Sequence, residues 1–232
     1  MLPAAVAMNA LSLPERLAGV DTWLFDMDNT LYPASANLFA QIDRRMEAYV
    51  GRLLGLPRAE ARLVQKRLFR EHGTTLRGLM NECHINPNGF LAEVHDIDMS
   101  VLDRDSRLRA ALARLPGRRI VFTNADRPYA ERVLDALGLE GCFDAIHDIH
   151  AMDYRPKPDP DSYRRLLEVQ GIAAERAFFA DDMALNLIPA SRLGLATGWV
   201  NNGSERGDDG HLPEHVDFEL TNLTDWLEEL TR

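Results

Sequence analysis

The chain has 232 residues, of which 46% are hydrophobic and 27% are charged, a composition typical of a globular protein with a sizeable core. Its formal net charge of −10 argues against a large nucleic-acid-binding surface, which needs a dense field of Lys and Arg on one face. This charge is compatible with a small anionic substrate, because a single metal ion or Lys reverses the local field inside a cleft.

The first 20 residues are expected to form a loose arm. The segment 1–10 is apolar and rich in small residues, but no positively charged segment precedes it, as a secretion signal would require. No apolar run is long enough to cross a membrane. Cys83 and Cys142 lack metal-ligand spacing and are too few for a disulfide framework. We therefore expect a cytoplasmic protein with no membrane partner.

The first strand is predicted at 22–25, where a short apolar run leads directly into Asp26. A purely helical pattern follows, with helices predicted over 38–53, 61–69, 76–83 and 87–95. Gly73 is placed to end the second of these helices. Because this stretch interrupts the chain after its first strand, we predict that residues 35–103 form an inserted helical cap.

Strands and helices alternate from residue 104 onward. The predicted strands cover 120–124, 143–149, 177–180 and 195–200, and the predicted helices cover 108–115, 128–138, 162–170 and 222–230. Such alternation predicts a parallel sheet with right-handed crossovers. The expected fold is α/β, a Rossmann-like doubly wound parallel sheet in residues 21–34 and 104–232 that carries the all-helical cap. The polar, Gly-rich run 201–210 is expected to be a mobile loop.

Polar side chains follow four of the apolar strands. They are Asp26 and Asp28, Thr123 and Asn124, Lys157, and Asp181 and Asp182. Ligands of open parallel sheets bind in the crevice beyond the carboxyl ends of the strands. We therefore expect these residues, far apart in the sequence, to meet in one site.

The residue types indicate phosphoryl chemistry with a metal ion. Asp26 and Asp28 repel each other in a dry cleft unless a cation lies between them or one is protonated. Mg²⁺ prefers a few carboxylate oxygens together with water and substrate phosphate, which suits Asp26 and Asp182. Asp26 can then attack phosphorus, while Asp28 donates a proton to the leaving oxygen and later accepts one from water.

Each motif taken alone has a simpler structural explanation. Asp26-x-Asp28 can be a turn whose side chains cap backbone groups, and Thr123-Asn124 can be a helix N-cap. Lys157 can be a solvated surface lysine, although the flanking prolines favour a stiff loop. Asp181-Asp182 can be a loop that begins a helix.

Together and in this order, the motifs resemble the haloacid dehalogenase superfamily of hydrolases. The resemblance is carried by Phe25-Asp-Met-Asp-Asn-Thr-Leu31, Phe122-Thr-Asn124, Lys157-Pro158 and Phe179-Ala-Asp-Asp182. It implies that Asp26 is the nucleophile and a metal ligand and that Asp28 is the acid/base, its carbonyl also on Mg²⁺. It also implies that Thr123 and the Asn124 backbone bind the phosphoryl group, that Lys157 steadies the charge, and that Asp182 anchors the metal, with Asp181 binding directly or through water.

Two positions depart from the pattern, because Met183 replaces the Ser or Gly of many relatives and Asn186 replaces the second Asp of some. Because of these departures, the resemblance does not specify which residues surround the metal ligands. Asp28 argues against dehalogenation, since the dehalogenating branch lacks this second aspartate.

Three further segments are similar to the pyrimidine 5′-nucleotidase branch, which carries a helical cap after the first motif. They are Asn29-Thr-Leu-Tyr-Pro33, Gly73-Thr-Thr-Leu-Arg-Gly-Leu79 and Val94-His-Asp96. The similarity implies hydrolysis of a nucleoside 5′-monophosphate such as UMP or CMP. The candidate specificity residues are Thr74, Thr75, Arg77, His95 and Asp96.

These cap residues also have structural alternatives. Thr74 and Thr75 can cap the next helix, Arg77 can be a solvated head on a packed stem, and His95 can be a structural histidine. Phe39, Met46 and Tyr49 are more typical of cap packing than of base stacking.

Two alternatives to a pyrimidine nucleotide phosphatase stay open. One keeps the chemistry but takes phosphoglycolate, a sugar phosphate or another small phosphate ester. The other is a binding module that has kept the fold and lost the chemistry. In each case the expected partner is a small molecule and not a nucleic-acid polymer.

Overall fold

The computed structural model describes residues 14–232, so the first 13 residues of the expected arm lie outside the described residues. In the rest of that segment, Glu15–Leu17 forms a 3₁₀ turn, and the side chain of Leu17 is fully buried. Within the described part of the chain, no helix is both long enough and apolar enough to span a lipid bilayer.

Six parallel strands form one sheet in the order β3-β2-β1-β4-β5-β6. They are β1 (Thr22–Phe25), β2 (Arg118–Phe122), β3 (Ala145–His147), β4 (Ala177–Asp181), β5 (Ala196–Val200) and β6 (Phe218–Leu220). Leu24 of β1 is in register with Ile120 on one side and Phe179 on the other. Because β1 is central and every one of its residues is buried, its sequence is a continuous apolar run.

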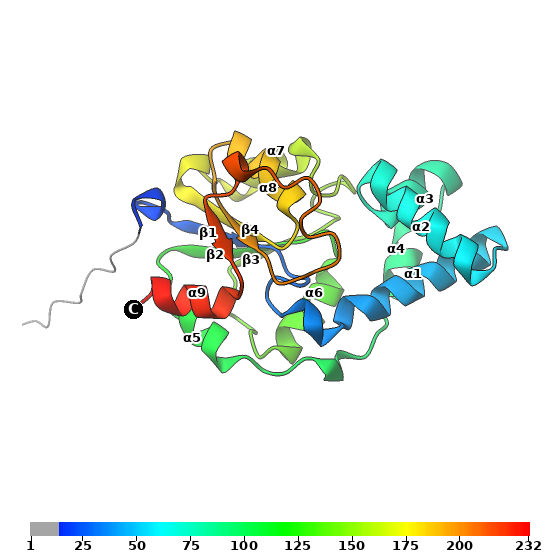
Figure 1. Ribbon diagram of the computed structural model, residues 1–232, viewed down its shortest axis with the longest axis horizontal. Coiled ribbons are helices and arrows are strands. Elements are labelled where there is room, and N and C mark those ends of the chain that lie inside the picture. The colour runs from blue at the N-terminus through cyan, green and yellow to red at the C-terminus, as the bar shows by residue number, and fades with distance from the viewer. Residues whose placement is uncertain (1–13) are drawn as a thin grey trace, which may run out of the picture.

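Helices cover both faces of the sheet (Figure 1). They are α5 (Ser106–Arg114), α6 (Arg127–Ala136), α7 (Pro160–Gln170), α8 (Ala184–Arg192) and α9 (Leu223–Leu230). α5 packs on α9 on one side, whereas α7 packs on α8, which covers β4 and β5, on the other. This arrangement confirms the predicted Rossmann-like α/β fold.

A separate group of four helices lies beside the carboxyl ends of the strands (Figure 1). These helices are α1 (Leu38–Leu54), α2 (Arg58–His72), α3 (Thr75–Cys83) and α4 (Pro87–Val94), so they follow β1 and precede α5. Glu47 of α1 is only 2% exposed, and it accepts hydrogen bonds from Arg58 and Arg62 of α2. These ion pairs, in which only Glu47 is buried, join the first two helices of the group.

Three elements differ from the sequence-based expectation. β6 has only three residues and lies at the edge of the sheet, so it lacks the apolar run that marks the inner strands. α8 contains Pro189, which breaks the helical hydrogen-bonding pattern and obscured the helix in the sequence. The third strand is also shorter than predicted, because only Ala145–His147 pairs with β2.

His147, the last residue of β3, is buried against the edge of the Phe122 ring, and neither of its ring nitrogens has a hydrogen-bond partner among the described residues. Burial lowers the pKa of His147 from 6.5 to about 4, although the neighbouring Asp148 opposes this shift. The unfolded chain therefore binds a proton at this residue at a higher pH than the folded chain does. The stability that neutral His147 contributes is fully present above pH 6.5 and is lost as the pH falls towards 4.

Replacing His147 by Phe is expected to remove this acid sensitivity, which amounts to roughly 3 kcal/mol between pH 7 and pH 4. The free energy of unfolding, measured by denaturant titration across that range, checks it. His84→Gln is the matched control, because His84 is exposed. Parallel profiles for the wild type and His147→Phe would contradict the assignment.

Candidate active site

Lys157 occupies the centre of a buried polar cluster at the carboxyl end of the sheet. Its side chain is only 1% exposed. The Nζ atom donates to Asp26 Oδ1 at 2.7 Å, to Asp181 Oδ2 at 2.7 Å and to the Phe122 carbonyl at 2.8 Å. Asp26 follows β1, Asp181 ends β4 and Phe122 ends β2, so three adjacent strands deliver these groups. The solvated-lysine alternative is therefore wrong.

The charges in this cluster depend on one another. Burial opposes the charge of Lys157, but Asp181 and Asp26 raise its pKa above the ordinary value, so the ammonium stays protonated. Burial raises the pKa of Asp26 well above its usual range; Lys157 opposes this rise, and Asp181 and Asp182 add to it. Because one ammonium faces several carboxylates, the site carries excess negative charge that a bound cation would neutralise.

Asp181 has all of its acceptor positions filled by the protein. Oδ1 accepts from the Met183 backbone N–H at 2.8 Å and from Asn186 Nδ2 at 2.9 Å. Oδ2 accepts from Lys157 at 2.7 Å and from the same amide at 3.0 Å. A carboxylate offers about four lone-pair sites, so Asp181 is saturated. Asn186 thus holds Asp181 in place, a role that the sequence analysis did not assign to it.

Asp182, the residue that follows β4, is also buried. Its carboxylate, with those of Asp26 and Asp181, forms a buried group whose oxygens lie within 4.8 Å of one another. Burial and then Asp181 raise the pKa of Asp182 to about 7, while a hydrogen bond from Ser204 opposes the rise. Such a group of close carboxylates is a candidate site for a divalent cation.

Asp28 lies two residues after Asp26, is half-buried, and is held by two tyrosines. The hydroxyl of Tyr32 donates to Asp28 Oδ1 at 2.6 Å, and the hydroxyl of Tyr129 donates to the same oxygen at 2.7 Å. Burial raises the pKa of Asp28, and the two hydroxyl groups oppose that rise. The sequence alone does not indicate that either tyrosine makes this contact.

Thr123 and Asn124 follow β2 and face the same cluster. Thr123 is 1% exposed, and its hydroxyl accepts from the Ala125 N–H at 3.1 Å. Asn124 Oδ1 accepts from the Lys157 N–H at 2.8 Å, and its Nδ2 donates to the Lys157 carbonyl at 3.2 Å. The Asn124 side chain therefore fixes the backbone that presents Lys157.

A cavity of about 890 Å³ lies between these residues and the helices α1–α4. Its core wall includes the predicted residues Asp26, Asp28, Thr123, Asn124, Lys157, Asp181 and Asp182. Its other wall is mixed, because the apolar residues Phe39, Ile42, Met46, Phe69, Phe90 and Val94 lie among polar and charged ones such as Lys66, Arg70 and Arg77. The cavity thus has a charged floor and a wall of mixed polarity.

The candidate specificity residues fall in different places. Thr74, Thr75, Arg77 and His95 all line the cavity. Thr74 caps α3 by accepting from the Arg77 N–H at 3.1 Å, and Arg77 Nη1 donates to the Tyr154 carbonyl at 3.1 Å. Asp96, by contrast, pairs with Arg45 at 3.1 Å, and its side chain is 77% exposed. The first four residues are placed to meet a ligand, and Asp96 is placed on the surface.

His95 is buried between the helical group and the sheet. Its Nδ1 lies 2.7 Å from Asp126 Oδ1, and its ring stacks on Tyr129 with centroids 4.2 Å apart. Arg132 donates to the His95 carbonyl at 2.8 Å. These contacts fix both the ring and the backbone of His95.

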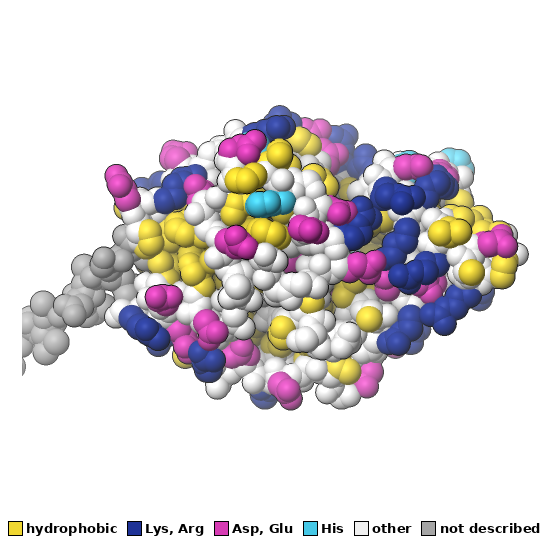
Figure 2. Space-filling model, in the orientation of Figure 1, with side chains coloured by type: hydrophobic (Ala, Val, Ile, Leu, Met, Phe, Trp, Pro, Cys, Tyr) yellow, Lys and Arg dark blue, Asp and Glu magenta, His cyan; other side chains and the backbone are white. Residues whose placement is uncertain are grey.

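The polar loop 201–210 reaches across to the helical group. Glu205 pairs with Lys66 of α2 at 3.5 Å, and the Arg206 guanidinium lies 5.1 Å from the centre of the Phe69 ring. Gly207 is buried where a Cβ would come within 2.9 Å of the Asp182 carbonyl. The loop therefore packs directly against Asp182. Lys66 also lines the cavity. Lys and Arg side chains are prominent on the face of the helical group that Figure 2 shows.

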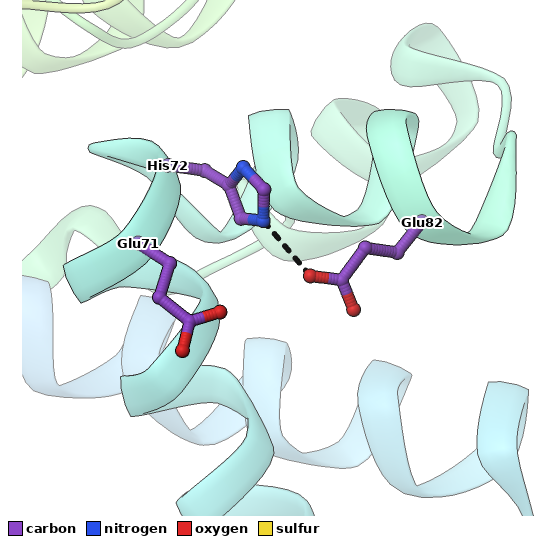
Figure 3. A group of neighbouring side chains, drawn as sticks. All are labelled: Glu71, His72 and Glu82. Atoms are coloured by element: carbon purple, nitrogen blue, oxygen red, sulfur yellow. Dashed lines mark hydrogen bonds and ion pairs between the residues drawn. The ribbon is translucent and has the colours of Figure 1, made fainter.

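A second group of possible metal ligands, Glu71, His72 and Glu82, lies at the C-terminal ends of α2 and α3 (Figure 3). His72 Nε2 lies 2.8 Å from Glu82 Oε1. Arg67 donates to Glu71 at 2.7 Å and to both oxygens of Glu82 at 2.8 and 2.7 Å. Because a guanidinium already neutralises both carboxylates, this group is an ion-pair network that joins α2 to α3.

Comparisons with known proteins agree with this arrangement. A family model for haloacid dehalogenase-like hydrolases matches residues 20–194. "Phosphate metabolism protein 8" of Saccharomyces cerevisiae (strain ATCC 204508 / S288c) is 25% identical over 228 residues, which cover 91% of this chain and 67% of that protein.

Two solved structures are similar in fold. The HAD-hydrolase YfnB of Bacillus subtilis, solved bound to magnesium, has a TM-score of 0.60 at 17% identity, with 92% of this chain and 99% of that chain covered. A HAD phosphatase of Thermococcus onnurineus has a TM-score of 0.58 at 19% identity, with coverages of 91% and 98%. Dehalogenases share the same fold, so these similarities do not distinguish between the two chemistries.

Proposed function

Since the chain belongs to the haloacid dehalogenase-like hydrolases, we propose that it is a phosphomonoester hydrolase that works through a phosphorylated Asp26. The observation that carries this proposal is the pairing of Asp26 with Lys157 at 2.7 Å on the floor of a large cavity, with Asp28 beside it. Asp28 favours phosphate ester hydrolysis over dehalogenation, because an alkoxide leaving group needs a proton and a halide does not.

The proposed reaction has two steps. In the first, an Asp26 oxygen forms a bond to phosphorus, the bond from phosphorus to the leaving oxygen breaks, and Asp28 donates its proton to that oxygen. In the second, water attacks the phosphoryl group, Asp28 takes a proton from the water, and the bond to Asp26 breaks to release phosphate. Lys157 and the Thr123 hydroxyl, with the Asn124 backbone, hold the phosphoryl oxygens.

The carboxylates fit a Mg²⁺ ion. Three buried acids facing a single ammonium form an all-oxygen donor set with excess negative charge, which is the environment that hard divalent cations prefer. We propose that Asp26, Asp182 and the Asp28 carbonyl hold the ion. Asp181, whose acceptor positions are filled within the protein, adds negative charge close to the ion. When bound, the ion neutralises phosphoryl charge and orients the substrate.

The proposed substrate is a pyrimidine nucleoside 5′-monophosphate such as UMP or CMP. A cavity of about 890 Å³ has room for a nucleoside beyond the phosphoryl site, and the apolar residues of its wall suit a heterocyclic base. In this proposal residues 35–103 act as a cap, and Thr75, Arg77 and His95 contact the substrate. A cytoplasmic location suits the two cysteines, Cys83 and Cys142, neither of which is in a disulfide.

A phosphate-release panel tests the substrate. With Mg²⁺ present, UMP and CMP are expected to give kcat/KM values at least roughly tenfold above that of p-nitrophenyl phosphate, because only the nucleotides use the cap wall for binding. EDTA is expected to abolish release, and added Mg²⁺ to restore it. Phosphoglycolate and a sugar phosphate belong in the same panel.

The panel separates the alternatives. If UMP and CMP are no better than p-nitrophenyl phosphate while another ester is much better, the nucleotide assignment fails and the phosphatase assignment stands. If no ester releases phosphate with Mg²⁺ present, a silent binding module replaces both. Activity that is indifferent to chelation contradicts the metal assignment.

A further inference from the structure

The Asp28 carboxylate is anchored asymmetrically. Both tyrosine hydroxyls donate to Oδ1, at 2.6 and 2.7 Å, and in the described part of the chain no hydrogen bond reaches Oδ2. Two donors occupy the two lone pairs of Oδ1. A proton carried by Asp28 therefore resides on Oδ2, and Asp28 lines the cavity.

The two tyrosines are themselves rigidly held. Tyr32 is 3% exposed and Tyr129 is 1% exposed. Burial first, and then Asp28, raises the pKa of both phenols well above the ordinary value, so they stay protonated and act as donors. Neither hydroxyl belongs to a motif that the chemistry above requires.

Tyr129 is connected in turn to the end of the helical group. Asp126, Tyr129 and Arg132 lie at i, i+3 and i+6 on α6, so they share a face of that helix. Asp126 bonds the His95 ring, Tyr129 stacks on it, and Arg132 donates to the carbonyls of His95 and Ile97 at 2.8 Å. This face of α6 therefore holds residues 95–97, which follow α4, in place.

We propose that Tyr32 and Tyr129 are positioning residues that hold Asp28 by one oxygen, so that the other delivers its proton to the leaving group, with His95 and Asp126 fixing Tyr129. This inference rests on the proposed function, because it assumes that Asp28 is the acid. It adds two residues to the reaction, Tyr32 from the segment that resembles the nucleotidase branch and Tyr129 from outside every motif. It also gives His95 a positioning role in addition to its proposed contact with the substrate.

The test compares two leaving groups in the full-length protein with Mg²⁺. p-Nitrophenolate leaves readily without a proton, whereas the alkoxide of UMP does not. Tyr129→Phe is expected to lower kcat/KM for UMP by roughly tenfold or more, and for p-nitrophenyl phosphate by less than about threefold, because only the first ester needs general acid catalysis. The parameter kcat/KM is used because it reports the step in which the leaving group departs.

Tyr49→Phe is the matched control. Tyr49 is a half-buried tyrosine that packs on Phe90, and it does not line the cavity. It is expected to leave both kcat/KM values unchanged. Tyr32→Phe provides the same test if Tyr129→Phe has a lowered unfolding midpoint.

Equal losses on the two esters, or no loss on either, would overturn the positioning role while leaving the hydrolase assignment intact. Failure of the wild type to hydrolyse any ester of the phosphate-release panel would overturn both. Asp28→Asn separates the two levels further, because it is expected to show an even larger difference between the esters. A leaving-group effect in Asp28→Asn without one in either tyrosine variant would confine the role to Asp28.

Discussion

Replacing Asp26 by Asn is expected to lower kcat by about 10⁴-fold or more, the scale of losses seen when a covalent nucleophile is removed. The amide keeps the shape of the carboxylate but cannot form the bond to phosphorus. Phosphate release from the best ester of the panel is the measurement. A phosphorylated protein detected by mass spectrometry in the wild type and absent in Asp26→Asn would support the same assignment.

Asp26→Asn is also expected to remain folded. Lys157 keeps its bonds to Asp181 and to the Phe122 carbonyl, so the ammonium is not left unpaired. The variant also removes a buried carboxylate whose desolvation opposes ionisation. Thermal unfolding checks this point, and mass spectrometry excludes deamidation back to Asp. Full activity in intact Asp26→Asn would exclude it as the nucleophile.

The sequence predicted the central sheet well because strands that are buried on both faces of a parallel sheet consist almost entirely of apolar residues. β1 and β4 have neighbours on both sides and are completely buried, and each reads as an unbroken apolar run. β6 lies at the edge with three residues, one of them exposed, so it leaves no such pattern. α8 was hidden for a different reason, because Pro189 lies inside a helix that tertiary contacts with β4 and β5 maintain.

The sequence also predicted which polar residues meet. Asp26, Lys157 and Asp181 come together because three neighbouring strands end at the same edge, and this follows from strand order alone. The individual hydrogen bonds among these three residues are visible only in the structure. Nothing in the sequence indicates that Asn186 fills two acceptor positions of Asp181, since that contact depends on how α8 leaves β4.

Side chains that act from outside the motifs were the hardest to predict. Tyr32 belongs to the segment that resembles the nucleotidase branch, and Tyr129 follows a proline at a helix start. Neither residue type is diagnostic, because buried tyrosines usually find some hydrogen-bond partner. Only the structure shows that both hydroxyls converge on a single oxygen of Asp28.

The largest effect on stability is expected from replacing Lys157 by Met. The variant leaves Asp26 and Asp181 buried and close together without their shared cation. Breaking a buried ion pair on one side costs about 3–5 kcal/mol, because the remaining charge is neither solvated nor paired. In a chain of this length such a loss lowers the unfolding midpoint by roughly 10 °C or more. Hydrolysis is expected to fall with it, since the phosphoryl oxygens lose their ammonium.

The only other lysine of the chain, Lys66, supplies the matched control for this prediction. It pairs with Asp43 at 3.0 Å and with Glu205 at 3.5 Å, but its side chain is 24% exposed, so Lys66→Met is expected to cost no more than about 1 kcal/mol. Adding Asp181→Asn to Lys157→Met is expected to recover part of the lost stability, because the double variant removes one of the two unpaired carboxylates. Chemical denaturation of the wild type, Lys157→Met, Asp181→Asn and the double variant measures the coupling free energy between the two residues. If Lys157→Met is no less stable than Lys66→Met, or if the second substitution recovers nothing, the carboxylates do not depend on Lys157 for their burial.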